Sequence, residues 1–348
     1  MTSSLPLLAA APLVAGLLGV PTTGVTAIRQ TAAESGQRIA NAPVPLLTAK
    51  VATSGMPDVV EHTIAPTASE RKRVLGYWTP RRMASALPVD RLSKAGGLLG
   101  RLFARAGRGV APHRSPNGAA ARTSGTRWTS GGMVERTTGR VFLTIKGSDF
   151  VCSASSVRSA NRDLVVTAGH CVKDGAGAWA DNWTFVPGYS QGRRPYGQYT
   201  ARRMFVAGPW SRGGDDSHDI GMVAVNTSDG KHLGDAVGGQ QIAFGIPRGR
   251  PASGFGFPAD SPYDGEHLVY CAGTLRDDPN GQTGDQGMRC DMTAGSSGGP
   301  WLSGFDPSTG RGTIVSVSSF KYSDDHRTMY GPYFGDSARE LYAMAATS

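Results

Sequence analysis

The hydrophobic pattern of the chain changes near residue 133. From there onward, apolar residues form short runs, and Gly, Pro, Asp and Asn separate one run from the next. Short apolar runs bounded by turn residues predict β-strands. The predicted strands cover residues 141–145, 150–157, 163–167, 183–187, 200–206, 220–225, 242–246, 252–257, 268–272, 313–319 and 329–334. Strands this short and this frequent are typical of a sandwich or a barrel.

An apolar run at residues 5–20 is followed by small residues at 25–27. This pattern predicts a secretory signal peptide that is cleaved after Ala27, so that residues 1–27 would be removed. A retained transmembrane anchor is the alternative, because no Lys or Arg precedes the run. Prolines interrupt the run, however, and it is short for a bilayer span. We therefore expect a secreted, extracellular protein without a stable membrane anchor.

The basic residues are concentrated upstream of the strand-rich part. Residues 28–127 contain 16 Lys and Arg against 5 Asp and Glu, whereas residues 128–348 contain 20 and 22, so the net charge of +9 comes from the first segment. That segment has only three aromatic residues, too few to bury a core by itself. We predict a basic, low-complexity propeptide or linker at 28–127, removed from a zymogen by cleavage at one of its arginines. Binding to nucleic acid or to a cell surface is the alternative role for this segment.

Local signals within the basic segment predict little regular structure. Thr79 is suited to cap a helix and Pro80 to its first turn, which predicts a short helix that ends near Ala86. Residues 95–106 place leucines at helical spacing, although three glycines weaken that helix. Residues 107–132 are rich in Gly, Ser, Thr, Pro and Arg and are typical of a linker.

Two short motifs and one acid carry candidate chemistry. Residues 295–300, Gly-Ser-Ser-Gly-Gly-Pro, place Ser297 among glycines that permit a tight turn and bring backbone N–H groups together. Residues 167–171, Thr-Ala-Gly-His-Cys, contain His170, and Asp219 directly precedes an apolar strand. A serine hydroxyl needs a base before it can attack a carbonyl, and an acid orients that base. The chain therefore contains a candidate catalytic triad in the order His, Asp, Ser.

These two blocks resemble the signature blocks of the trypsin/chymotrypsin-like serine peptidases, and in particular of secreted bacterial members. The resemblance covers residues 133–348. It implies an all-β fold: two six-stranded antiparallel β-barrels with the active site in the cleft between them. A short C-terminal helix, which residues 336–346 look like, would follow the barrels, and a largely irregular N-terminal pro-segment would precede them. The peptidase domain would then span residues 128–348.

The resemblance also implies the activity. The chain would be a serine endopeptidase that hydrolyses peptide bonds of protein or peptide substrates through an acyl-enzyme. The backbone N–H groups of Gly295 and Ser297 would form the oxyanion hole. We expect a monomer that needs no metal or organic cofactor, and no nucleic acid partner for the mature domain.

Two further alternatives fit parts of the pattern. A catalytically silent relative could serve as a binding module, although all three triad positions are filled. Gly295-x-Ser297-x-Gly299 also matches the nucleophile turn of α/β-hydrolases. That fold needs its acid and histidine after the serine, in a strand–turn–helix context that is missing here.

Substrate selection is predicted from position relative to the serine. Asp291 lies six residues before Ser297, where trypsin-branch relatives carry an acid at the floor of the S1 pocket, which selects Arg or Lys. A purely structural acid is the alternative. Residues 312–319 resemble the strand that forms one wall of S1, with Ser316 in the place of the serine that touches the triad acid, Asp219. The expected substrate contacts are Asp291, Ser316, Val317 and Ser318.

The chain has four cysteines, which in an exported protein indicate two disulfides with three possible pairings. The resemblance implies a bond between Cys152 and Cys171, beside His170. We pair Cys271 with Cys290, which would brace the segment that leads to the serine. No CxxC motif is present, so a zinc site is not favoured.

Overall fold

The computed structural model describes residues 58–90 and 122–348. The expected signal peptide at 1–27 and the expected helix at 95–106 lie outside the described residues. Within the described ranges, no helix is long and apolar enough to cross a membrane.

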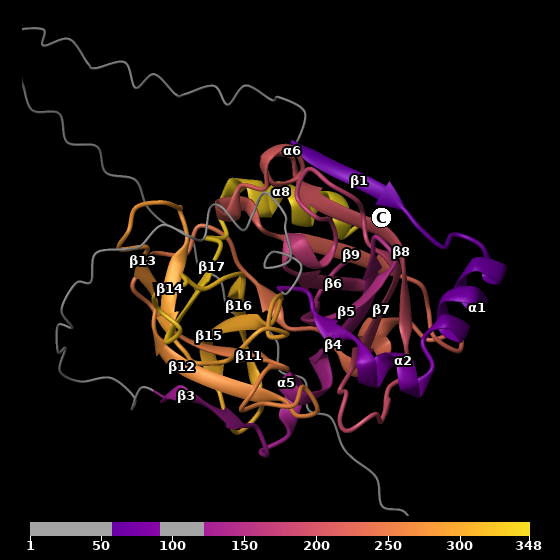
Figure 1. The fold of residues 1–348 in the computed structure, drawn as a ribbon, viewed down its shortest axis with the longest axis horizontal. Helices are drawn as coiled ribbons and strands as arrows, with labels where there is room; N and C mark the ends of the chain where they lie inside the picture. The colour runs from indigo at the N-terminus through magenta and orange to yellow at the C-terminus, as the bar shows by residue number, and fades with distance from the viewer. Residues whose placement is uncertain (1–57, 91–121) are drawn as a thin grey trace, which may run out of the picture. The chain divides into compact units, whose positions relative to one another are not determined.

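Six antiparallel strands close into a barrel in the first half of the domain (Figure 1). They are β4 (Thr138–Ile145), β5 (Ser148–Val157), β6 (Leu164–Thr167), β7 (Asp181–Pro187), β8 (Tyr199–Ala207) and β9 (Gly221–Val225). The order around the barrel is β7, β4, β5, β6, β9 and β8, and the pairing of β8 with β7 closes it. Each of these strands overlaps one predicted from the hydrophobic pattern.

Strand β4 shows how the barrel is filled. Successive side chains of a strand point to opposite faces. Val141 and Leu143 pack in one buried cluster with Phe185 and Val223, which lines the barrel interior, whereas Phe142 belongs to a second cluster with Phe255 of the other half. The strand is buried on both faces, and the second cluster joins the barrel to the rest of the domain.

The second half consists of a six-stranded and a three-stranded sheet. The six strands run in the order β10 (Gln241–Ile242), β16 (Arg311–Val317), β15 (Pro300–Asp306), β11 (Pro251–Gly256), β12 (Val269–Thr274) and β3 (Arg122–Arg127). The other three are β13 (Arg276–Asp277), β14 (Gln286–Arg289) and β17 (Thr328–Gly331). Strands β3, β13, β14 and β15 had no counterpart in the hydrophobic pattern, and β10 is only two residues long. This arrangement is consistent with the chymotrypsin-like double barrel.

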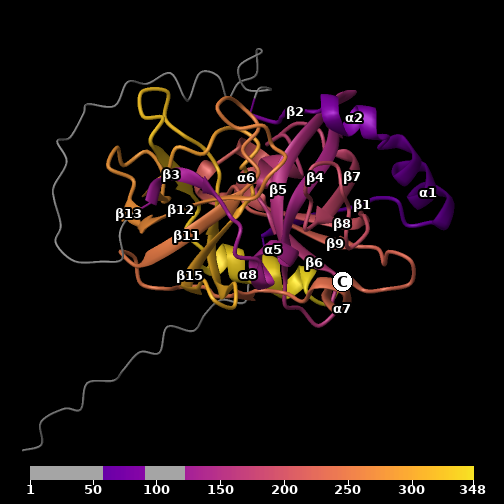
Figure 2. The same ribbon diagram turned by 90° about the horizontal axis from the view of Figure 1, so that it is seen from below.

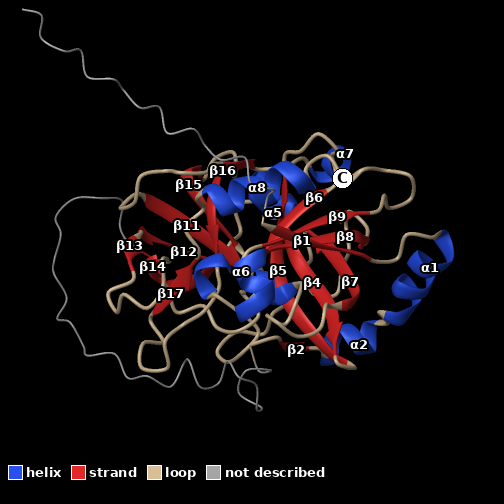
Figure 3. Ribbon diagram, turned by 90° about the horizontal axis from the view of Figure 1, so that it is seen from above, coloured by secondary structure: helices blue, strands red, loops and turns tan. Residues whose placement is uncertain are grey.

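Helices are short and lie outside the sheets. The predicted C-terminal helix is confirmed as α8 (Asp336–Ala345), which buries Leu341 and lies over the junction of the two groups of strands (Figure 3). The remaining helices of the domain are α5 (Gly132–Thr137), α6 (Gly208–Gly213), α7 (Leu233–Val237), and the 3₁₀ turns η1 (Gly169–Cys171) and η2 (Asp216–His218).

Strand β3 corrects the prediction of a linker at 107–132. Thr126 pairs with Tyr270 of β12, so this stretch is the outer strand of the six-stranded sheet. Trp128, which follows it, is buried between aromatic rings. The stretch has no alternation of apolar and polar residues and contains Gly125, which disfavours a strand, so its pairing with β12 decides its conformation.

Residues 58–90 pack against the first barrel (Figure 2). They form β1 (Val59–Thr63), α1 (Ala68–Tyr77), α2 (Pro80–Ser85) and β2 (Leu87–Pro88). The helix predicted from Thr79 and Pro80 is confirmed as α2. The other three elements were not predicted, because β1 and β2 depend on pairing with strands far along the chain and the polar helix α1 has a weak apolar pattern.

Asp285, directly before β14, is a buried acid that weakens the fold at neutral pH. The residue is 1% exposed, and neither carboxylate oxygen has a hydrogen-bond partner within the described ranges. Burial, followed by the charges of Asp216 and Asp219, raises the pKa of Asp285 to about 9. Because the pKa of Asp285 in the folded state lies above the ordinary value of 3.8 for an aspartate, its stabilising contribution is complete below about pH 4 and is lost as the pH rises towards 9.

We therefore expect Asp285→Asn to raise the melting temperature at pH 8 more than at pH 4. Each kcal/mol gained corresponds to about 2–4 °C in a chain of this size. Thermal unfolding followed by circular dichroism at both pH values measures the effect. Asp277→Asn, at an exposed position of β13, is the matched control and should give no such difference. An equal gain at both pH values would contradict the assignment.

Candidate active site

The pairing of β6 with β9 brings His170 to Asp219. Thr167 at the end of β6 lies opposite Gly221 at the start of β9. His170 follows shortly after β6, and Asp219 comes shortly before β9. His170 Nδ1 is 2.7 Å from Asp219 Oδ2, and the backbone N–H of His170 donates to Asp219 Oδ1 at 2.7 Å. Asp219 is 1% exposed, so its carboxylate is held rigidly behind the ring.

Ser319 completes the surroundings of Asp219. Its hydroxyl donates to Asp219 Oδ2 at 2.5 Å. The prediction that Ser316 fills this place is wrong, because Ser316 donates to the carbonyl of Pro332 instead. The end of β16 and the residues that follow it carry serines at 316, 318 and 319, and composition alone cannot tell which of them faces the acid.

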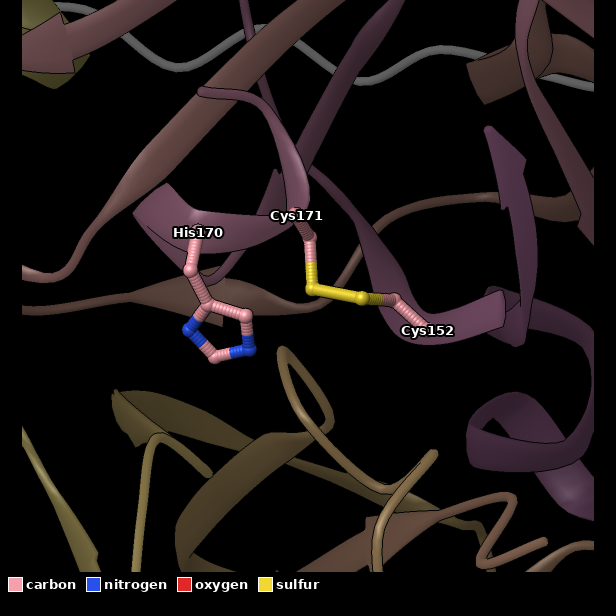
Figure 4. Close-up of side chains that lie close together, drawn as sticks. All are labelled: Cys152, His170 and Cys171. Atoms are coloured by element: carbon pink, nitrogen blue, oxygen red, sulfur yellow. A yellow bond between two sulfur atoms is a disulfide. The ribbon is translucent and has the colours of Figure 1, made fainter. Parts of the chain in front are cut away.

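Both predicted disulfides are confirmed. Cys152 of β5 is bonded to Cys171 of η1, and Cys271 of β12 to Cys290. Figure 4 shows the imidazole of His170 beside the first bond. Potential metal-ligand atoms of Cys152, His170 and Cys171 lie within 4.8 Å of one another. Since the disulfide uses both sulfurs, neither can serve as a thiolate ligand, and the cluster does not fit a metal.

The loop that carries Ser297 packs directly on β5. Gly295 and Gly298 have φ angles of 94° and 81°, a region that favours glycine. A Cβ at Gly298 would lie 2.0 Å from Thr167 Oγ1, so no other residue fits there. Ser153 of β5 donates its N–H to the carbonyl of Ser297 at 2.8 Å and its hydroxyl to the carbonyl of Gly295 at 2.9 Å.

Ser297 and His170 meet at one carboxylate oxygen, that of Asp90. Ser297 Oγ donates to Asp90 Oδ1 at 2.9 Å, and His170 Nε2 lies 3.6 Å from the same atom. The N–H of Gly295 donates to Asp90 Oδ2 at 3.2 Å. The structure thus brings together the predicted serine, histidine, acid and oxyanion-hole donor. Sequence reasoning missed Asp90, since no local signal marks it.

The acids around His170 decide its protonation. Burial lowers the pKa of the ring, but Asp219, through its charge and its hydrogen bond, and then Asp90 and Asp216 raise it to about 9. The imidazole is therefore protonated at neutral pH while Asp90 is in place, and a protonated ring cannot accept the serine proton. Burial, followed by the charge of Asp219, raises the pKa of Asp216 to about 7.

Asp291 has a structural role in this fold. Its Oδ1 accepts hydrogen bonds from the N–H of Gly125 at 2.6 Å and from the hydroxyl of Tyr263 at 2.7 Å. No hydrogen bond to Oδ2 is found in the part of the chain that the structure describes. The nearby Lys321 donates to the carbonyls of Cys290 and His326, and burial lowers its pKa to about 8.

The other expected substrate contacts lie beneath the surface. Ser316, Val317 and Ser318 are fully buried, so their side chains are not available to a substrate. The carbonyl of Ser318 accepts from the N–H of Gly298, and its own N–H donates to the carbonyl of Gly299. The backbone of Ser318 therefore holds the serine loop in place.

Comparisons with known proteins agree with this geometry. No family profile matches the chain. The protease Anisep from Arthrobacter nicotinovorans is 43% identical, with a TM-score of 0.59 over 61% of this chain and 96% of that one. The thermostable serine protease AL20 from an extremophilic microorganism is 39% identical, with a TM-score of 0.59 over 62% of this chain and 99% of that one.

Two weaker similarities complete the comparison. A Glu endopeptidase is 18% identical, with a TM-score of 0.52 over 64% of this chain and 97% of that one, which shows the fold alone. A protein of Bacillus subtilis (strain 168) named extracellular metalloprotease is 33% identical over 103 residues, which span 30% of this chain and only 33% of that relative. On the strength of the fold, the paired His170 and Asp219, and the two serine proteases covered almost completely, the chain belongs to the chymotrypsin-like serine peptidases.

Proposed function

We propose that this chain is an extracellular serine endopeptidase that cleaves peptide bonds with Ser297, His170 and Asp219. The observation that carries the proposal is the shared oxygen of Asp90, which lies within contact of both the serine hydroxyl and the imidazole Nε2. A substrate carbonyl that replaced this carboxylate would lie within reach of Ser297 Oγ and of the N–H of Gly295, and His170 Nε2 would be free to accept the serine proton. The two disulfides are consistent with an oxidising, extracellular location.

Each residue would have one task in the reaction. With the site open, His170 Nε2 takes the proton of Ser297 Oγ as the oxygen attacks the carbonyl carbon. Asp219 fixes the ring and stabilises the imidazolium that forms. The N–H groups of Gly295 and Ser297 stabilise the oxyanion. The imidazolium then donates its proton to the leaving amine, and water hydrolyses the acyl-enzyme by the reverse roles.

A catalytically silent binding module is the second candidate. The complete set of hydrogen bonds around Asp219, including the one from Ser319, favours the enzyme, because a binding module would have no need to orient the imidazole. We further propose that the mature enzyme is a monomer that acts on protein or peptide substrates without a resident cofactor.

Labelling with a fluorophosphonate tests the nucleophile. We expect mature protein from the culture medium to be labelled and Ser297→Ala to show no label, because the probe needs an activated serine oxygen. Asp219→Asn should lower kcat on the order of 10⁴-fold, since the imidazole would lose its orientation. Asp215→Asn, in the same loop, is the matched control and should leave kcat unchanged. Equal labelling of Ser297→Ala would reject the proposed nucleophile.

The choice of residue at P1 is proposed from Asp291. Its Oδ1 is anchored by two donors, which leaves Oδ2 as the oxygen that would bind a cation. We expect cleavage of a peptide library to occur mainly after Arg and Lys. Asp291→Asn should lower kcat/KM for an arginine substrate by roughly tenfold or more, the loss of one charge-assisted hydrogen bond. A profile dominated by Glu or Phe would overturn this preference.

A further inference from the structure

Residues 58–90 reach the candidate active site along the outside of the first barrel. At the start of this path, β1 pairs with β8 over five residues, from Val59 opposite Ala207 to Thr63 opposite Arg203. Addition of a strand to a sheet supplies main-chain hydrogen bonds whatever the side chains are. Asp58, just before β1, forms two hydrogen bonds with the guanidinium of Arg212.

An aromatic anchor fixes the middle of the path. Trp78 is 1% exposed, its Nε1 donates to the carbonyl of Asn182 at 2.5 Å, and its ring lies 5.6 Å from that of Phe142. Beside it, Tyr77 donates its hydroxyl to Asp149 at 2.6 Å, and Arg82 forms an ion pair with the same acid. Because burial of a large aromatic side chain is strongly favourable, Trp78 is the main anchor of the segment.

The last residues of the segment run beside β5 towards the serine loop. Pro88 pairs with Val151 in a parallel arrangement, and the N–H of Val89 donates to the carbonyl of Val151. Ser153, two residues further along β5, donates its N–H to the carbonyl of Ser297 and its hydroxyl to that of Gly295. The neighbouring strand therefore directs the next residue of the segment, Asp90, into the catalytic centre.

The carboxylate of Asp90 occupies the place of the reacting group. It accepts hydrogen bonds from Ser297 Oγ and from the N–H of Gly295, and it lies against His170 Nε2. The serine proton therefore points to Asp90 and away from the base. The group at the nucleophile is a side-chain carboxylate, a poor electrophile, rather than a peptide carbonyl, so the segment binds without presenting a bond to cut.

We propose that residues 58–90 are a built-in inhibitor of the peptidase, and that Asp90 is the group that silences Ser297, by binding its hydroxyl and the N–H of Gly295, one of the two proposed oxyanion-hole donors. This proposal rests on the proposed function. The inhibitor is a segment of the same chain, and it binds the peptidase domain at three places. Strand β1 pairs with β8, Trp78 is buried next to Asn182, and Asp90 lies in the catalytic centre. The negative charge of Asp90 also adds to the larger effect of Asp219, which raises the pKa of His170 and favours the protonated imidazole.

The test uses the full chain and compares its intact form with its processed form. A short exposure to a fluorophosphonate, followed by separation on a gel, reports the labelling rate of each band. We expect the intact band of the wild type to be labelled slowly. Asp90→Ala should raise the rate of the intact band by roughly tenfold or more, because it removes the charge-assisted hydrogen bonds. The processed bands should be labelled equally in both.

Three further variants separate the carboxylate from the stability of the segment. Asp90→Asn keeps the shape without the charge and should raise the rate less than Asp90→Ala. Trp78→Ala removes the anchor at a distance from the site and should also raise it. Asp58→Ala removes the ion pair with Arg212 at the far end of the segment and should raise the rate much less than Asp90→Ala.

The outcomes distinguish the two proposals. In one outcome, the processed band is labelled while the intact bands of Asp90→Ala and wild type react at the same rate. That result would reject Asp90 as the inhibitor and would still support the proposed peptidase function. If Asp58→Ala raises the rate as much as Asp90→Ala, general loosening of the segment explains the result and the role of Asp90 is rejected. If no band of any variant is labelled, the proposed function itself fails.

Discussion

The contact of Ser153 with the serine loop joins the two halves of the domain into one site. This buried side chain of β5 donates to the carbonyl of Gly295 and accepts from the N–H of Phe257, while its N–H donates to the carbonyl of Ser297. The first barrel holds His170, whereas the second half holds Ser297. Each buried polar group that loses its hydrogen-bond partner lowers the free energy of unfolding by about 1–3 kcal/mol. The relative position of the two halves is therefore fixed where the nucleophile must meet its base.

How much the sequence could predict depends on how local each signal is. The motif around His170, the glycines around Ser297 and the short apolar strands are properties of neighbouring residues, and the structure places them as expected. The serine that contacts Asp219, by contrast, was predicted to be Ser316 but is Ser319. The register at the end of a strand depends on the strand with which it pairs. Residues 58–90 were missed for a similar reason: β1 and β2 gain their structure from β8 and β5, far along the chain.

The acids near His170 divide into two groups at neutral pH. Burial is the main reason why the pKa of Asp216 is raised to about 7 and that of Asp285 to about 9. Both carboxyl groups are therefore at least partly protonated, and so partly neutral, at pH 7. The hydrogen-bonded Asp219 and the intruding Asp90 face the imidazole directly. Removal of Asp90 takes away one of the charges that raise the pKa of His170 and brings the ring closer to the neutral form that a general base requires.

The proposed inhibition would use a hydrogen-bond donor that the proposed catalysis also needs. An oxyanion hole attracts an anion of suitable shape, and the carboxylate of Asp90 accepts from the N–H of Gly295 and from the hydroxyl of Ser297. Its few contacts would hold a free carboxylate weakly, since each charge-assisted hydrogen bond contributes about 1.5–3 kcal/mol. The covalent tether, with the anchors of β1 and Trp78, raises the local concentration of the carboxylate to the order of millimolar or more. Loss of the tether on chain cleavage leaves only the anchors, and dilution outside the cell then favours release of the segment.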